Sequence, residues 1–431
     1  MNRFFIFITA GFFCCGALSA SAQISVGKPA GLQEALHSML RNHPALAGKQ
    51  AQVRSKESAA DAARAARYPS ISASTGAGQS SGYSGASTTT VSARQPLWAF
   101  GRIDSSIAYA DQDIQVQQAD AWSTRRQLLE ETAASYASVQ GARERLAVAE
   151  RSVQRHQELQ QQIQRRANGG LASAVDVSMA QARWLQARSQ RESTGTDLRN
   201  AEAALFALTQ VFIASDLPIP HAALNLPSDP AISEQVWAQS AAIRLREAVV
   251  ALAEADVQRE RSANMPTVLL EAARNHVARL PNQASSTTIN IVMQASLEGM
   301  GLANQAQQRA ALERVEAARQ DLAQLRHEQQ VQLQQLLDRR ASDQALLAGY
   351  AESVATLENT LTSFRRQYES GYKSWLDVLN AVRELTEQQM QQAQVQANWR
   401  INSLRLATRM GWFDEPAAIL TQPQETTITV R

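Results

Sequence analysis

Most of the chain consists of segments in which apolar and small residues recur every three or four positions, the period of an amphipathic helix. Two of these segments, Arg102–Asn168 and 303–369, contain no proline and predict helices about 100 Å long at 1.5 Å per residue. The other helical segments are about half as long and span 32–67, 175–212, 232–263 and 375–410. Because two short helices stacked end to end match one long helix, the pattern predicts a rod rather than a globule.

The two long helices carry seams in which the spacing between apolar or small residues alternates between three and four, as in coiled coils. The first seam consists of Leu128, Thr132, Ser135, Val139, Ala142, Leu146, Ala149 and Val153. The second consists of Leu347, Tyr350, Val354, Leu357, Leu361, Phe364 and Tyr368. Faces rich in glutamine and alanine flank both seams, which favours a closed ring of helices around water. An ordinary bundle core is the alternative explanation for each seam residue taken singly.

Four shorter segments alternate apolar and polar residues, which is typical of strands with one apolar face. The clearest, 287–297, is apolar at Ile289, Ile291, Met293, Ala295 and Leu297. Its partner, Thr267–Ala278, is apolar at Val268, Leu270 and Ala272, but Glu271 and Arg274 interrupt the run. A weaker pair, 71–75 and 91–97, surrounds a loop rich in glycine and serine at 76–87, with Tyr68, Trp98 and Phe100 at its base.

The longer strand segments have the length of tilted transmembrane β-strands, which need about ten residues. Four strands cannot close a barrel, and lipid excludes open sheet edges. If the strands lie in a membrane, several copies of the chain must therefore pool them. Two soluble surface hairpins are the alternative explanation of the same pattern.

One order of elements occurs twice, about 200 residues apart, which indicates an internal duplication. Pro69 and Pro266 each end a helical segment, because proline cannot continue a helix, and strands follow both. Each long helix later ends at a glycine turn, at Gly170 and Gly371. We expect a leader at 1–22, a first repeat at 23–212, a linker at 213–230, a second repeat at 231–411 and a C-terminal tail at 412–431.

The first 22 residues have the pattern of a secretory signal: Arg3, an apolar run too short to span a bilayer, and small residues up to Ala22. The only two cysteines, Cys14 and Cys15, lie inside this segment, so we expect a mature chain without disulfides or thiol chemistry. Lipidation of Cys14 or Cys15 is an alternative, but the bulky residues before them argue against it.

Composition and motifs exclude several classes of function. The formal net charge of +2 argues against a nucleic-acid-binding protein, which needs a concentrated basic face. The six histidines include no i, i+4 pair, and the chain has neither a phosphate-binding glycine-rich loop nor a nucleophile elbow. No later segment reaches 18 consecutive apolar residues, so no transmembrane helix is expected. We therefore expect a protein that is not an enzyme and that uses no cofactor or metal.

Several short motifs, taken in order, resemble the TolC family of outer-membrane channels. They are Asn42-His43-Pro44-Ala45-Leu46, Tyr68-Pro69-Ser70, Gln95-Pro96-Leu97 with Gly101-Arg102, and the two turns at 170–177 and 371–378. The resemblance covers the chain to about residue 411. It implies a mainly α protein with a small transmembrane β portion. Three copies would share one twelve-stranded outer-membrane barrel and a long coiled-coil α-barrel, with most of the mass in the periplasm.

In the TolC family the two glycine turns form the periplasmic tip, where the channel closes at rest and a periplasmic adaptor docks. The resemblance therefore places adaptor docking on Gly170, Leu171, Ser173, Gly371, Tyr372 and Ser374. It places the gate on Asp176, Tyr368, Lys373, Asp377 and Asn380.

The resemblance also implies roles for these gate residues. Tyr368 and Lys373 would connect to Asp176 across neighbouring helices, and three copies of Asp377 would form a negative ring that attracts cations. Asn380 stands where the family often has a second acid, so the ring would carry less charge. Lys373 in place of arginine lacks bidentate geometry. Solvated charges at helix ends are the alternative explanation.

The segment 374–384 looks most like members that serve type I secretion of large proteins such as adhesins. The resemblance then implies a periplasmic adaptor, an inner-membrane transporter of the ABC type, outer-membrane lipid and an exported protein as partners, without nucleic acid. Efflux of drugs or other small molecules is the first alternative. A periplasmic coiled-coil adaptor or scaffold without a channel is the second, although it predicts neither the amphipathic strands nor the duplicated long helices.

Overall fold

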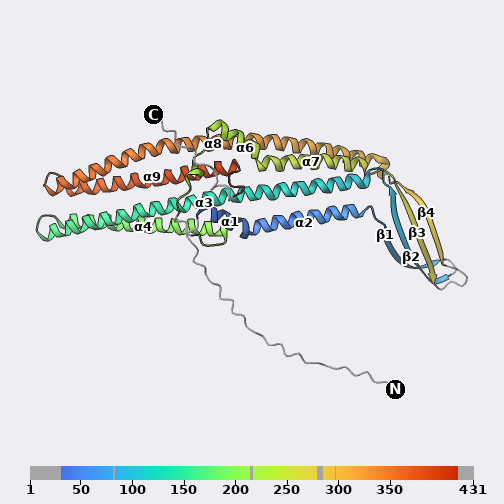
Figure 1. The fold of residues 1–431 in the computed structure, drawn as a ribbon. Coiled ribbons are helices and arrows are strands. Elements are labelled where there is room, and N and C mark those ends of the chain that lie inside the picture. The colour runs from blue at the N-terminus through green and yellow to red at the C-terminus, as the bar shows by residue number, and fades with distance from the viewer. Residues whose placement is uncertain (1–30, 81–82, 214–216, 279–284, 297, 416–431) are drawn as a thin grey trace, which may run out of the picture.

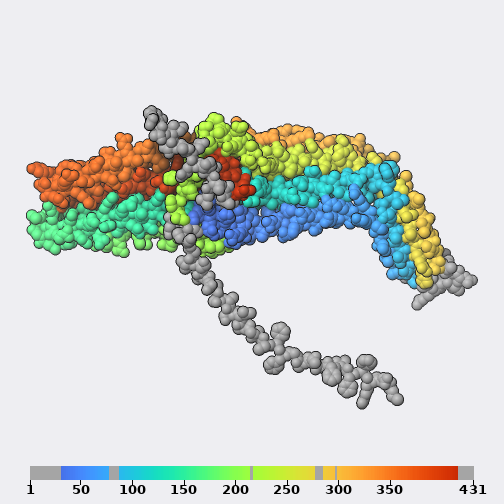
Figure 2. Space-filling model, viewed as in Figure 1, coloured from blue at the N-terminus to red at the C-terminus, as the bar shows by residue number. Residues whose placement is uncertain are grey.

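The computed structural model describes residues 31–80, 83–213, 217–278, 285–296 and 298–415. The expected leader, most of the expected C-terminal tail, and parts of the linker and of the loop at 76–87 lie outside these residues. The described chain is an elongated rod of helices that carries a β-sheet at one end (Figures 1 and 2).

Two long helices, α3 (Arg102–Asn168) and α8 (Leu302–Glu369), run the length of the rod. The shorter helices α2 (Pro44–Ala65) and α4 (Ala174–Thr209) follow one another along α3, and α7 (Ala241–Ser262) and α9 (Trp375–Arg409) follow one another along α8 (Figure 1). Helices α7 and α9 also pack on α3 and thereby join the two halves. This arrangement is the predicted stacking of two short helices beside each long one.

Two of the helices expected from the sequence are each divided into two. The segment 32–67 forms α1 (Leu32–Asn42) and α2, because Pro44 begins a new helix and His43 has extended backbone geometry. The segment 232–263 forms α6 (Asp229–Gln239) and α7, with an extended Ser240 whose hydroxyl accepts from the Ile243 amide at 3.4 Å. A short helix, α5 (His221–Leu224), precedes them in the expected linker.

The four strands form one antiparallel sheet in the order β1-β2-β3-β4. Their bounds are β1 (Ser70–Ser80), β2 (Tyr83–Trp98), β3 (Thr267–Ala278) and β4 (Ser286–Gln294). The last strand was expected to end at residue 297 but ends at Gln294. A 3₁₀ turn, η1 (Glu298–Gly301), leads into α8. Gly299 and Met300 have positive φ angles there, which an extended strand cannot accommodate.

The register gives the sheet two different faces. On one face Ile71, Ala93, Ala272 and Ile289 lie in one row across the four strands. On the other face the corresponding row is Ser70, Arg94, Glu271 and Asn290. Glu271, which interrupts the apolar pattern of its strand in the sequence, therefore points to the polar face, where its carboxylate lies 3.2 Å from the Arg94 guanidinium.

The helical core is concentrated in the middle of the rod and near its end opposite the sheet. In the middle, Tyr136 is fully buried and its hydroxyl donates to the Leu217 carbonyl at 2.7 Å. The expected loose tail at 412–431 begins with packed residues, because Phe413 is only 1% exposed and Asp414 forms an ion pair with the buried Arg126.

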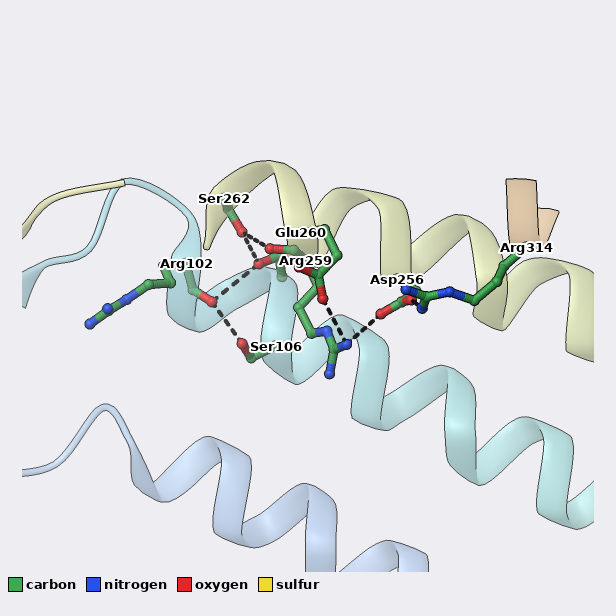
Figure 3. Close-up of polar contacts among 8 residues, drawn as sticks. Arg102, Ser106, Asp256, Arg259, Glu260, Ser262 and Arg314 are labelled. Carbon is green, nitrogen blue, oxygen red and sulfur yellow. Dashed lines mark hydrogen bonds and ion pairs between the residues drawn. The ribbon is translucent and has the colours of Figure 1, made fainter. Parts of the chain in front are cut away.

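Polar contacts tie three helices together just beneath the sheet (Figure 3). The Asp256 carboxylate of α7 is buried between Arg259, at 2.6 Å, and Arg314 of α8. The Ser262 hydroxyl of α7 bonds to the Ser105 hydroxyl of α3. These contacts link the helix ends that support the strands.

Candidate functional site

The two glycine turns lie together at the end of the rod opposite the sheet (Figure 1). In the first turn the Leu171 amide donates to the Arg166 carbonyl at 2.8 Å, and Gly170 donates to Ala167 at 3.0 Å. In the second turn the corresponding bonds run from Tyr372 to Gln367 at 2.9 Å and from Gly371 to Tyr368 at 3.1 Å. Both are Schellman helix ends, in which a glycine adopts the left-handed conformation, here with φ angles of 74° and 82°.

Each turn leads directly into a capped helix. Ser173 and Asp176 form a capping box at the start of α4, with each side chain accepting from the other residue's amide. Ser374 and Asp377 form the same box at the start of α9. The serine and aspartate that recur in the two turns therefore have a structural role, which is to satisfy the free amides of a helix N-terminus.

Asp176 is held as an anion by its surroundings. Hydrogen bonds from the Ser173 backbone and hydroxyl lower the pKa of its carboxyl, and the Trp375 side chain adds a smaller contribution in the same direction. Because Trp375 belongs to α9 and Asp176 to α4, the start of the second turn's helix lies close to the start of the first turn's helix.

Tyr368 and Lys373 both have aromatic or cationic neighbours in the same protomer. Tyr368 is 9% exposed, and the Arg166 guanidinium lies 4.4 Å above its ring. The Lys373 ammonium lies 4.6 Å above the Phe364 ring. Tyr368 and Lys373 were expected to connect to Asp176, but within one protomer they make these ring contacts instead. Their connection to Asp176 of a neighbouring protomer stays a prediction.

The other predicted tip residues differ in their exposure. Leu171 is 77% exposed and Tyr372 is 85% exposed, although both are apolar or aromatic. Asn380 is also exposed, whereas Asp377 is half-buried at its helix cap. Their roles in docking and in the gate stay predictions.

Sequence reasoning missed three residues that the structure brings to this site: Arg166, Phe364 and Trp375. Phe364 and Tyr368 lie in one predicted seam, so an aromatic cluster near the tip was foreseeable from the pattern. The positions of Arg166 and Lys373 over these rings could not be predicted, because the spacing of residues along a helix does not indicate where the charged end of a long side chain lies.

Two searches of the described residues bear on other kinds of site. None of these residues gather into a cluster of three or more His, Cys, Asp or Glu side chains suited to a metal ion. Among the same residues, none of the helices combines the length and the apolar character needed to cross a bilayer.

A family model described as "Outer membrane efflux protein" matches residues 35–209 and 232–412. No curated protein matches the chain. Three solved structures illustrate the similarity of fold, each at 19% sequence identity: the CusC transmembrane channel, VceC of Vibrio cholerae and the open MtrE channel of Neisseria gonorrhoeae. Their TM-scores are 0.75, 0.70 and 0.74; the matches cover 93%, 88% and 88% of this chain and 99%, 96% and 88% of theirs.

Proposed function

The chain belongs to the outer membrane efflux protein family, and we propose that three copies of it form the exit duct of a tripartite export system. It is an outer membrane channel with a helical periplasmic extension, and it is not an enzyme. The assembly, the gate and the cargo are the parts of this proposal that go beyond the family.

The sheet carries the argument for assembly. Strands β1 and β4 are its two outer strands, and each has one edge without a partner strand among the described residues. Its apolar face includes Ile289 and Ile291, which are 70% and 72% exposed, whereas its polar face carries the Arg94–Glu271 pair. Such a sheet can lie in lipid only when its edges are paired, and pairing β1 of one copy with β4 of the next would close a barrel.

The helices support the same ring. One side of the layer ends in α2 and α4, which pack on α3, and the other ends in α8, which packs on α7 and α9. Exposed apolar residues remain on both sides: Met179 and Leu185 on α4, and Leu312, Val331 and Leu346 on α8. If the α2/α4 edge of one copy packs against the α8 edge of the next, the copies form a head-to-tail ring.

Disulfide crosslinking tests the number of copies. In a chain with Cys14 and Cys15 replaced by alanine, Ser72→Cys on β1 would be combined with Thr288→Cys or Asn290→Cys on β4. All three positions lie on the polar face of the sheet. Oxidation in the outer membrane should give a ladder of species that stops at three copies.

The matched control is Ser72→Cys alone, which should remain monomeric on the denaturing gel because β1 does not meet β1. A ladder that extends beyond three copies, or a folded double variant that never crosslinks, would contradict the trimer.

We propose that the two turns form the gate and the adaptor-docking tip. The exposed Leu171 and Tyr372 would supply apolar contact area for the adaptor, and Asp176, Tyr368, Lys373, Asp377 and Asn380 would surround the aperture of the trimer. Leu171→Ser with Tyr372→Ser should abolish export while leaving the crosslinked trimer intact. Phe212→Ser, an 85% exposed position just beyond the end of α4 and away from the tip, is the control, and equal loss of export in both would count against docking at the tip.

We propose a large protein such as an adhesin as the cargo, delivered by an ABC-type inner-membrane transporter through a periplasmic adaptor. The similarity of residues 374–384 to type I secretion members supports this choice. Efflux of small molecules is the second candidate, and the description of the matching family favours it.

A deletion strain separates the two cargos. Loss of a secreted protein with unchanged growth in toxic compounds, restored by the wild-type gene, is the expected result. Unchanged secretion with increased sensitivity to toxic compounds would establish efflux instead.

A further inference from the structure

The charged residues of the sheet differ between its two faces. On the polar face Arg94 pairs with Glu271. On the opposite face Arg274 and His276 of β3 are both exposed, and neither forms an ion pair or hydrogen bond with a residue that the structure describes. The described part of this face contains no carboxylate, so its positive charge is not balanced there.

The register places these two residues on the apolar face. Ala272 lies opposite Ala93 and Ile289, and side chains alternate along a strand, so Arg274 and His276 share the face of Leu270 and Ile291. Arg274 lies opposite Val91 on β2 and Thr287 on β4, and His276 lies opposite Thr89.

The depth of the two residues follows from the strand geometry. At the helical end of the sheet, Val268 lies opposite the exposed Trp98, whose ring packs edge-on against Phe100 at 6.0 Å. Aromatic residues of this kind mark the boundary of a membrane's hydrocarbon region. Arg274 is six residues farther along, which is about 20 Å along the strand and about 15 Å along the membrane normal at a tilt of about 40°.

The apolar part of this face ends at the same level. Beyond Val91 the next residues on the face are Thr89 and Thr75, whose hydroxyls lie 3.3 Å apart. An arginine extends by several ångströms and turns its charged end towards the polar boundary. Extended in this direction, the Arg274 guanidinium would reach to within a few ångströms of the far boundary of the apolar band, which is about 25 Å tall in outer-membrane barrels.

We infer that Arg274 and His276 bind the phosphate group of lipid headgroups in the leaflet farther from the helices. The guanidinium fork matches phosphate oxygens in pairs, and an imidazole N–H and the exposed Thr287 hydroxyl add donors beside it. Lipid is the occupant because the neighbouring residues on this face, Leu270 and Ile289, are exposed apolar side chains that face the membrane in a closed barrel. This inference rests on the proposed insertion of the pooled sheet in the outer membrane.

The test measures phospholipid retained by the purified full-length assembly. The protein in detergent is incubated with mixed micelles that contain dioleoylphosphatidylglycerol, and bound lipid is counted by mass spectrometry of the intact complex. Micelles that contain a galactosyl diacylglycerol, which has no phosphate, supply the comparison. Arg274→Gln with His276→Gln should lower retained phosphatidylglycerol at least about fivefold, because a basic residue near a membrane surface contributes about 1 kcal/mol, and galactolipid should stay unchanged.

Two further variants sharpen the result. Arg94→Gln removes an arginine from the opposite face of the same sheet and should leave lipid retention unchanged. Arg274→Lys keeps the charge and should retain more phospholipid than Arg274→Gln. Equal retention by the wild type and the double variant, or an equal loss in Arg94→Gln, would overturn the inference.

The outcomes for assembly and for lipid are separate. If the paired-cysteine chain gives no crosslinked trimer in the outer membrane, the proposed channel assembly fails. If the double variant assembles normally and keeps its phospholipid, only the lipid site fails.

Discussion

Gly141 lies at a close approach between α3 and α9, and replacing it with alanine tests how tightly the two halves of the rod are packed. A methyl group at this position would lie 2.3 Å from the Ala397 Cβ. Ordinary contact between carbon atoms is about 3.5–4.0 Å, so the two helices would have to separate by roughly 1.5 Å at this point. Overpacking of a core in this way costs about 1–3 kcal/mol.

Helix propensity opposes this loss, because alanine is about 1 kcal/mol more favourable than glycine in a helix interior. Gly195→Ala in α4 is therefore the matched control. Its new methyl group would lie 3.6 Å from Arg199 Nη1 and 4.0 Å from Leu146 Cδ1, which is ordinary contact. The propensity gain cancels between the two variants, so Gly141→Ala should be less stable than Gly195→Ala by about 1–3 kcal/mol.

The assay is thermal unfolding of the purified full-length protein, followed by far-ultraviolet circular dichroism. For a chain of this length the expected difference in midpoint is roughly 1 °C per kcal/mol. Amide hydrogen exchange should increase around Gly141 and Ala397 and remain unchanged at the tip. In the double variant Gly141→Ala with Ala397→Gly, the new methyl takes the place of the old one, so a coupling of about 1–3 kcal/mol should appear. Equal midpoints for Gly141→Ala and Gly195→Ala, with no coupling in the double variant, would refute the close approach.

Three further predictions follow from the helices and the sheet. His156 is 6% exposed, and burial, with smaller repulsion from nearby arginines, lowers its pKa to about 4. The neutral imidazole's contribution to stability is therefore complete above the unfolded-state pKa near 6.5 and is lost as the pH falls towards 4. Chemical unfolding at pH 7.5 and 4.5 should show a loss of about 2–3 kcal/mol in the wild type that is absent in His156→Gln. Asp414→Asn weakens the largely buried pair with Arg126 and should cost about 3 kcal/mol, measured as earlier thermal unfolding; an unchanged midpoint would show that the pair adds nothing. Ile289→Lys on the apolar face should cost about 2–4 kcal/mol and reduce the trimer crosslinked through Ser72→Cys and Thr288→Cys, whereas Asn290→Lys on the polar face should be tolerated; equal assembly would contradict the assignment of faces.

Local patterns in the sequence were sufficient for most of the elements. The helix Arg102–Asn168 and the strand Thr267–Ala278 have the bounds that periodicity predicts, because the periods of helices and strands depend on residues only a few positions apart. The glycine turns were equally visible, since a left-handed helix end strongly favours glycine. The breaks at His43 and Ser240 were missed because the apolar pattern continues across them, although Pro44 is a sufficient physical reason for the first.

The sequence by itself determined the class of protein, because the duplicated long helices, the amphipathic strands and the paired glycine turns each depend on residues only a few positions apart. Only the tertiary structure decided which distant side chains meet. It brought Trp375 close to Asp176, placed Arg166 over Tyr368, and left Arg274 on the apolar face while pairing Glu271 with Arg94. The physical reason is that a period states which way a side chain leaves its own backbone, whereas its partner depends on the packing and register of elements far away in the chain.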